Sequence, residues 1–280
     1  MSLLRRFLFT VLALLAFAAN SVLCRLALRD SGIDPASFTS LRLLSGALVL
    51  CLLARLRRPG AAWAGNTGSA LALCVYAAAF SYAYVHLSTG TGALLLFGAV
   101  QVSMIGYGLW RGERLHGRQT VGLLLAIAGL VLLLAPGITA PPLPSALLML
   151  AAGLAWGVYS LRGRQQGDPI AVSAGNFLRA APMAVLLSLA SWGSAQLPLG
   201  GALYALASGG ITSGLGYAIW YTVLPQLKPS TAASVQLSVP LLAALAGVLW
   251  LGEAPTWRLA WAAAALLGGI LLVLRGKPAR

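Results

Sequence analysis

The sequence predicts an all-α polytopic membrane protein with ten transmembrane helices arranged as two inverted five-helix repeats. Three observations predict this fold class. Apolar residues dominate the whole chain, positive charges gather in alternate loops, and a short motif of the first half returns in the second half. Together they place nearly the whole chain within a lipid bilayer.

The composition excludes a soluble globular domain. Of the 280 residues, 59% are hydrophobic and 9% are charged, whereas soluble domains have about 45–50% and about 25%. The mean hydropathy is +0.87. Because a helix that crosses a bilayer uses about 20 apolar residues, the chain has material for roughly ten crossings.

Apolar stretches bounded by proline, glycine and charged residues define the ten expected helices. In the first half they are Phe7–Cys24, Pro35–Ala54, Thr67–His86, Gly90–Trp110 and Arg118–Ala135. In the second half they are Pro144–Leu161, Ile170–Ser191, Gly200–Leu224, Ser230–Leu251 and Trp257–Leu274.

The basic residues indicate how these helices are oriented. The two termini and the loops after the second, fourth, sixth and eighth helices hold 14 of the 19 Lys and Arg residues. The opposite loops hold only Arg25, Arg29 and Arg258. Lys and Arg are enriched in cytoplasmic loops, so we expect both termini in the cytoplasm of a bacterial-type inner membrane. The same rule explains the net charge of +14, so no nucleic-acid partner is predicted.

An internal repeat divides the chain into residues 1–140 and 141–280. Leu109-Trp110-Arg111-Gly112-Glu113 returns as Leu249-Trp250-Leu251-Gly252-Glu253, and Gly129-Leu130-Val131-Leu132 returns as Gly269-Ile270-Leu271-Leu272. Each half contains five expected crossings, an odd number, so the second half enters the membrane inverted. Inverted repeats are frequent in secondary transporters because the two halves can exchange inward and outward openings.

The paired Gly112-Glu113 and Gly252-Glu253 turns, each before the last helix of its half, identify a family. Over residues 7–275 the sequence resembles the EamA branch of the drug/metabolite transporter superfamily, and within it the bacterial exporters of amino acids, including aromatic ones. The resemblance implies a basket of ten helices. Its central cavity would be lined mainly by the third, fourth, eighth and ninth helices, with contributions from the first and sixth.

Polar and aromatic side chains on these helices are the predicted substrate-binding residues. They are Asn20, Tyr82, His86, Phe97, Gln101, Trp156, Tyr159, Tyr217, Trp220 and Gln236. Tyr82 and His86 are spaced i, i+4 and therefore share one helix face. An apolar pocket with a few hydrogen-bonding groups is the usual form of a small-molecule site, although Tyr and Trp also form interface belts and His86 could be a helix-end residue.

Two arginines and two glutamates leave alternatives open. Arg42 and Arg179 lie about two turns inside expected helices, where each either snorkels to the helix end or binds a substrate carboxylate. Glu113 and Glu253 either form gate ion pairs or cap the links between helices, and the position after glycine favours the capping role.

The functional hypothesis is a transporter that exports amino acids or similar small amphipathic metabolites by alternating access, with weak ion coupling or none. All five acidic residues lie in loops or at helix ends, which disfavours a proton relay through buried carboxylates. The alternatives are a proton-coupled multidrug or metabolite antiporter and an intramembrane lipid-modifying enzyme. No catalytic, metal or cofactor site is predicted. The expected partners are a small-molecule substrate and the bilayer, and a monomer is the simplest expected state.

Overall fold

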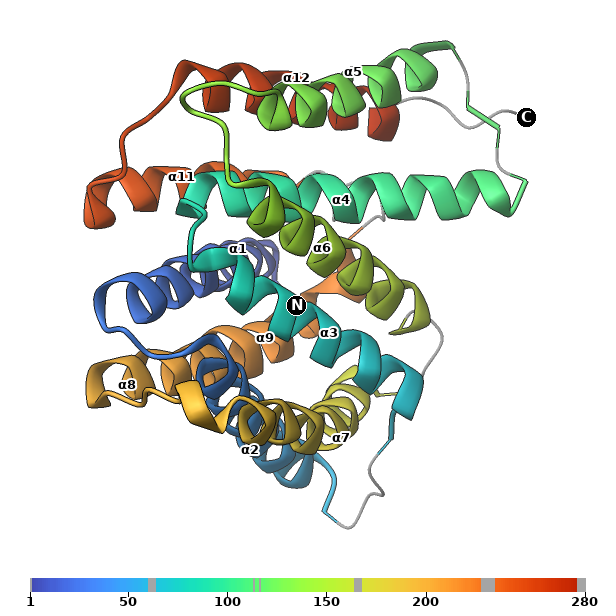
Figure 1. Ribbon diagram of the computed structural model, residues 1–280. Helices are drawn as coiled ribbons and strands as arrows, with labels where there is room; N and C mark the ends of the chain where they lie inside the picture. The colour runs from blue at the N-terminus through green and yellow to red at the C-terminus, as the bar shows by residue number, and fades with distance from the viewer. Residues whose placement is uncertain are drawn as a thin grey trace.

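The computed structural model describes residues 2–59, 64–112, 114–115, 117–163, 168–227 and 235–275, whose regular structure is entirely helical (Figure 1). The helices of the first half are α1 (Leu3–Arg25), η1 (Leu26–Asp30), α2 (Pro35–Arg57), α3 (Thr67–Tyr84), α4 (Thr89–Trp110) and α5 (Gly117–Leu134). Those of the second half are α6 (Leu143–Gly163), α7 (Pro169–Ala190), η2 (Trp192–Ser194), α8 (Leu199–Ala207), η3 (Ser208–Leu215), α9 (Gly216–Val223), η4 (Leu224–Gln226), α11 (Ser238–Leu251) and α12 (Trp257–Arg275).

Short polar side chains cap the N-termini of several of these helices. Asp34 accepts a hydrogen bond from the Ser37 N–H, Asn66 from the Ser69 N–H and Ser88 from the Thr91 N–H. Such N-caps satisfy backbone donors that have no partner inside the helix. At the C-terminal end of α11, Gly252 has the left-handed backbone conformation (φ 63°) that commonly terminates a helix.

The helices pack in pairs that combine the two halves of the chain. α5 lies beside α12 at one edge of the bundle, and α2 lies beside α7 at the opposite edge (Figure 1). Between these edges α4 contacts α6 and α11, and α3 contacts α6 and α7. α1 contacts α9, α11 and η3, so elements distant in sequence surround the centre of the bundle.

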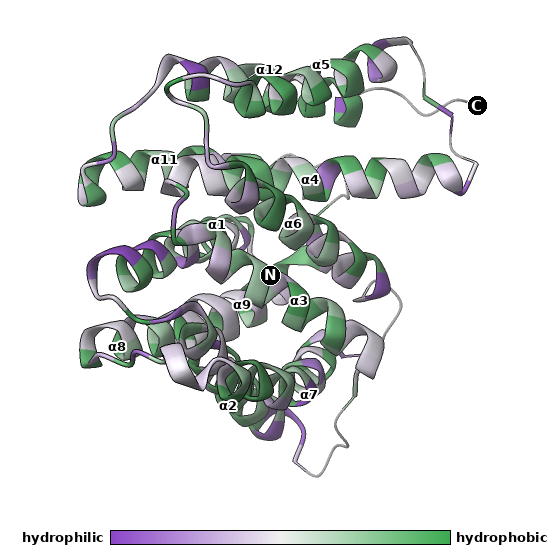
Figure 2. Ribbon diagram, viewed as in Figure 1, coloured by the Kyte–Doolittle hydropathy of each residue, from purple (hydrophilic) through white to green (hydrophobic). Residues whose placement is uncertain are grey.

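The surface of the bundle is suited to lipid. Large apolar side chains such as Leu48, Leu186 and Trp250 are exposed, and Figure 2 shows hydrophobic residues along most helices, with hydrophilic residues concentrated toward helix ends and loops. Within the described part of the chain, seven helical spans are long and apolar enough to cross a membrane: α1 with η1, α2, α4, α5, α6, α7 and α12. The fold is therefore that of a polytopic membrane protein, and ten crossings stay a prediction.

The structure differs from the predicted helices mainly in the second half. The helix expected over Gly200–Leu224 is divided, because a π-helical segment, η3, separates α8 from α9. The helix expected over Ser230–Leu251 appears as α11, and residues 228–234 lie outside the described part. In the first half, α3 ends at Tyr84, so His86 follows the helix instead of closing it.

Candidate functional site

Arg42 on α2 is a buried charged residue with 2% of its surface exposed. Its Nε donates to Ser213 Oγ at 3.3 Å, and its Nη2 donates to Tyr76 Oη at 3.0 Å. Its Nη1 is also buried and has no hydrogen-bond partner. Tyr76 and Ser213 both lie well inside their helical segments, so the Arg42 side chain does not snorkel to a helix end.

Two aromatic rings flank the same guanidinium group. The Arg42 Cζ lies 5.1 Å from the centre of the Tyr76 ring and 4.9 Å from the centre of the Phe80 ring. Each such cation–π contact contributes about 0.5–2 kcal/mol. The ion pairs found among the described residues are Arg25–Glu253 and Arg29–Asp30, so no carboxylate in that part of the chain pairs with Arg42.

Ser213 reaches Arg42 from η3, a wide helical segment rich in glycine. A β-carbon at Gly209 would collide with the Arg42 carbonyl oxygen and with Ser45 Oγ. Glycine therefore allows the backbones of η3 and α2 to approach closely, as small residues do in membrane proteins. π-helical turns occur frequently at functional sites.

An aromatic cluster continues from Arg42 into the second half of the chain. The Trp156 ring lies 4.8 Å from Tyr76, 5.3 Å from Tyr159 and 5.3 Å from Tyr217, measured between ring centres. The Tyr217 ring also contacts the rings of Phe17, Phe177 and Tyr221. The Phe17 ring in turn contacts Trp220. Three predicted residues thus meet at the Trp156 ring, namely Trp156, Tyr159 and Tyr217, and Trp220 is joined to Tyr217 through Phe17.

Asn20 joins α1 to the same π-helical segment. Its Oδ1 accepts hydrogen bonds from Ser208 Oγ at 2.7 Å and from Thr212 Oγ1 at 3.1 Å. Asn20, Ser208 and Thr212 are all buried. This predicted residue therefore fixes the position of η3, which carries Ser213.

The five remaining predicted residues differ in burial. Tyr82 is half-buried and makes no ring contact among the described residues, and His86 is exposed after the end of α3. Phe97 and Gln101 are buried on α4, and Gln236 is half-buried in the short helical turn before α11. Among the described residues no ring contact joins Tyr82, His86 or Phe97 to Trp156, and contact of these five residues with substrate stays a prediction.

Arg179, the counterpart of Arg42 in the second half, has ordinary backbone partners. Its Nη1 donates to the Ala64 carbonyl at 2.9 Å and to the Gly175 carbonyl at 2.8 Å. Arg179 thus anchors the segment that leads into α3. The two arginines, which the sequence did not distinguish, have different environments.

Glu253 connects the two halves at one end of the bundle. Both of its carboxylate oxygens accept from the Thr89 N–H at 2.9 Å, and Arg25 Nε lies 3.5 Å from Oε1. Arg25 also donates to the carbonyls of Tyr84 and Val85 at the end of α3. Glu253 therefore caps α4, a helix of the opposite half, and not its own link; Glu113 lies outside the described residues.

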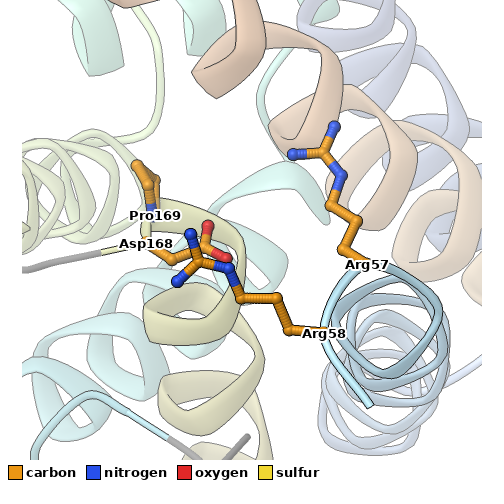
Figure 3. Close-up of a pocket in the computed structure, with 4 residues that line it drawn as sticks. All are labelled: Arg57, Arg58, Asp168 and Pro169. Atoms are coloured by element: carbon orange, nitrogen blue, oxygen red, sulfur yellow. The ribbon is translucent and has the colours of Figure 1, made fainter.

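A separate surface pocket of about 690 Å³ is lined by Arg57, Arg58, Asp168 and Pro169. Figure 3 shows the Arg58 side chain at the end of α2 extending toward Asp168 at the start of α7. Arg57 is 15 residues beyond Arg42 in the same helix, which corresponds to about 22 Å. The pocket is thus distinct from the buried site around Arg42.

Comparison with known proteins identifies the family. The model of the EamA-like transporter family matches residues 5–135 and again residues 143–275. The chain belongs to the EamA-like transporter family. The resemblance seen in the Gly-Glu turns is therefore confirmed. The chain is a multi-pass membrane transporter. The alternative hypothesis of a lipid-modifying enzyme is wrong.

Individual relatives cover most or part of this EamA-like chain. An uncharacterised protein of Pseudomonas aeruginosa is 60% identical over 99% of this chain and 96% of its own. A probable terminal-alkyne amino-acid exporter of Streptantibioticus cattleyicolor is 27% identical over 95% of this chain and 92% of its own. The threonine/homoserine exporter RhtA of Salmonella typhimurium is 32% identical over 56% of each chain.

A solved crystal structure of another protein shares this fold. It superposes with a TM-score of 0.68 and covers 97% of this chain and 98% of its own, at 21% sequence identity. At that identity the likeness concerns the arrangement of helices alone. The helical bundle described above therefore has an experimentally determined counterpart.

Proposed function

We propose that this EamA-like transporter exports amino acids, or similar small amphipathic metabolites, from the cytoplasm across a bacterial-type inner membrane by alternating access. The observation that carries the proposal is the buried site around Arg42, Tyr76 and Trp156. Helices of both halves build it, and it combines aromatic surface with a few polar groups, as small-molecule sites do. The names of two relatives, both exporters of amino acids, indicate the substrate class.

The topology in this proposal has ten crossings in two inverted five-helix repeats, with both termini in the cytoplasm. Contacts between loops support it. Arg25 contacts Glu253 and Val85, three residues that the topology assigns to the periplasmic side. Arg162 donates to Asn66 Oδ1 and Ser69 Oγ, and the topology assigns all three to the cytoplasmic side.

The same topology gives the surface pocket a place. Its residues Arg57, Arg58 and Asp168 belong to the cytoplasmic ends of α2 and α7 in this assignment. The pocket would then be a vestibule on the side from which an exported substrate enters. Two arginines at its rim would raise the local concentration of substrates that carry a carboxylate.

Export in this proposal is driven by the substrate gradient. The described acidic residues, Asp30, Asp34, Asp168 and Glu253, all lie at or beyond helix ends. Proton pumps and antiporters commonly use carboxylates within the membrane. His86 is exposed and follows the end of α3.

The test is a counterflow panel on the purified protein in proteoliposomes. Liposomes loaded with an unlabelled amino acid should accumulate the same labelled amino acid from outside, whereas loaded liposomes without protein should not. Lipophilic cationic dyes serve as the comparison, because a multidrug exporter would carry them. Exchange of dyes without exchange of any amino acid would contradict the proposal.

A further inference from the structure

The feature that the proposed function leaves unexplained is the uncompensated charge of Arg42. Its guanidinium group is enclosed by protein, and Nη1 has no acceptor. Its other contacts are two hydroxyl oxygens and two aromatic rings, none of which carries a full negative charge. A buried charge without an ionised partner costs several kcal/mol, so such an arrangement needs a reason.

Other arginines of the same chain show what a structural role looks like here. Arg179 donates to two backbone carbonyls, and Arg258 donates to the carbonyls of Ala135 and Pro136. Arg25 combines two carbonyls with the Glu253 carboxylate. A carboxylate compensates a guanidinium group better than a neutral acceptor does, and among the described residues Arg42 has neither a carboxylate nor a carbonyl partner.

We propose that Arg42 binds the carboxylate of the transported substrate. This assignment rests on the proposed function and names the substrate group that the site recognises. A carboxylate is planar, carries one negative charge and can accept from the free Nη1 hydrogens in the fork geometry that arginine favours. It would neutralise the buried charge in the state where substrate is enclosed.

The surroundings of Arg42 support a ligand over an anchor. Ser213 comes from η3, an interruption of regular helix, and transporter sites are commonly formed by discontinuous helices near the middle of the membrane. The Tyr76 ring that holds Arg42 also contacts Trp156, so the apolar part of a substrate would find the aromatic cluster beside its carboxylate. A phosphate group would call for a second cation, and the residues described around Arg42 offer hydroxyls and rings instead.

The first experiment compares carboxylates with their amides in counterflow. Labelled L-threonine and L-phenylalanine are the probes, and unlabelled L-threonine, L-phenylalanine and their two carboxamides compete with them. The carboxamide keeps the size and the amino group and removes the negative charge. Truncation of one partner in a buried charge pair is costly, so the amides should need about 30-fold or more higher concentration to compete.

The second experiment tests Arg42 itself. Arg42→Gln removes the positive charge, and Arg42→Lys keeps the charge but lacks the planar guanidinium group that can bind both carboxylate oxygens. Arg179→Gln is the matched control, because it removes an arginine within a helix whose partners are backbone carbonyls. Arg42→Gln should lose the preference for carboxylate over amide, Arg42→Lys should retain part of it, and Arg179→Gln should keep it.

A third measurement does not depend on transport. Acetate, compared with sodium chloride at equal ionic strength, should raise the melting temperature of the wild-type protein through binding to the folded state, and the rise should be absent in Arg42→Gln. Acetamide should have no such effect on either protein.

The outcomes separate the two proposals. If an amino acid is exchanged and its amide competes equally well, the Arg42 assignment is overturned while the proposed function stands. If no amino acid is exchanged but acetate stabilises in an Arg42-dependent way, the proposed function fails and the carboxylate site stands. If acetate has the same effect on wild type and Arg42→Gln and no amino acid is exchanged, both fail.

Discussion

Replacing Glu253 with glutamine should weaken the contact that joins the two halves of the chain. The Glu253 carboxylate accepts twice from the Thr89 N–H at 2.9 Å and once from Thr89 Oγ1 at 3.1 Å. Its side chain is 11% exposed and that of its partner Arg25 is 13% exposed. Solvent therefore screens this ion pair less than a surface pair.

The magnitude follows from these contacts. Loss of an N-cap costs about 1 kcal/mol, and a hydrogen bond to a charged group contributes about 1.5–3 kcal/mol. Glutamine keeps one acceptor oxygen for Thr89 but leaves Arg25 without a counter-charge. We expect Glu253→Gln to lower the free energy of unfolding by about 1–2 kcal/mol.

The second ion pair of the described residues provides the control. The Arg29 and Asp30 side chains are 37% and 39% exposed, and exposed pairs contribute about 1 kcal/mol or less. Asp30→Asn removes one charge near the same end of the bundle. Its effect should therefore be clearly smaller than that of Glu253→Gln.

Unfolding of the purified variants in detergent, followed by tryptophan fluorescence, measures both effects. The double variant Arg25→Gln with Glu253→Gln should be less destabilised than the sum of the two single variants, because the residues interact. Equal effects of Glu253→Gln and Asp30→Asn would refute the assigned role of Glu253. Strict additivity in the double variant would refute the coupling to Arg25.

Three further predictions follow from the fold and the site. Gly209→Ala should destabilise the protein by about 2 kcal/mol or more, because the added β-carbon would collide with the Arg42 carbonyl oxygen. Gly106→Ala is the control, because a β-carbon added there meets no atom within 4 Å. Equal melting temperatures of the two variants would contradict close packing at η3. Topology reporters fused after Arg58, Arg118 and Arg280 should all report cytoplasm, and a periplasmic signal from any of them would exclude the ten-helix topology. Alanine at Tyr82, His86 or Gln101 should lower transport in liposomes without changing the melting temperature; unaltered transport in all three variants would remove these residues from the substrate path.

Sequence patterns could predict most of the fold because bilayers impose simple rules. Apolar length and flanking charges were enough to find the helices that begin at Pro35, Thr67 and Trp257. The π-helical segment was not predictable, since a glycine-rich stretch such as Gly209–Gly210 is compatible with several helical geometries. Its geometry depends on packing against Arg42 and Ser45, which no local pattern encodes.

The candidate site was only partly predictable for a similar reason. Trp156 and Tyr217 stood out as aromatic residues on the expected cavity helices, and the structure brings them together. Periodicity could not indicate that Tyr76 and Ser213 hold Arg42, or that Arg179 finds backbone carbonyls instead. Such differences arise from tertiary contacts between segments more than 30 positions apart in the chain.

The most direct test of the central claim is counterflow of labelled amino acid in proteoliposomes with no ion gradient, with and without ionophores for protons and sodium. The account predicts exchange of a net-neutral amino acid that ionophores do not abolish, because the described carboxylates lie at or beyond the ends of the helices. Uptake that becomes concentrative only under an imposed proton gradient, and that is lost in His86→Ala, would contradict it and make the protein a proton-coupled antiporter.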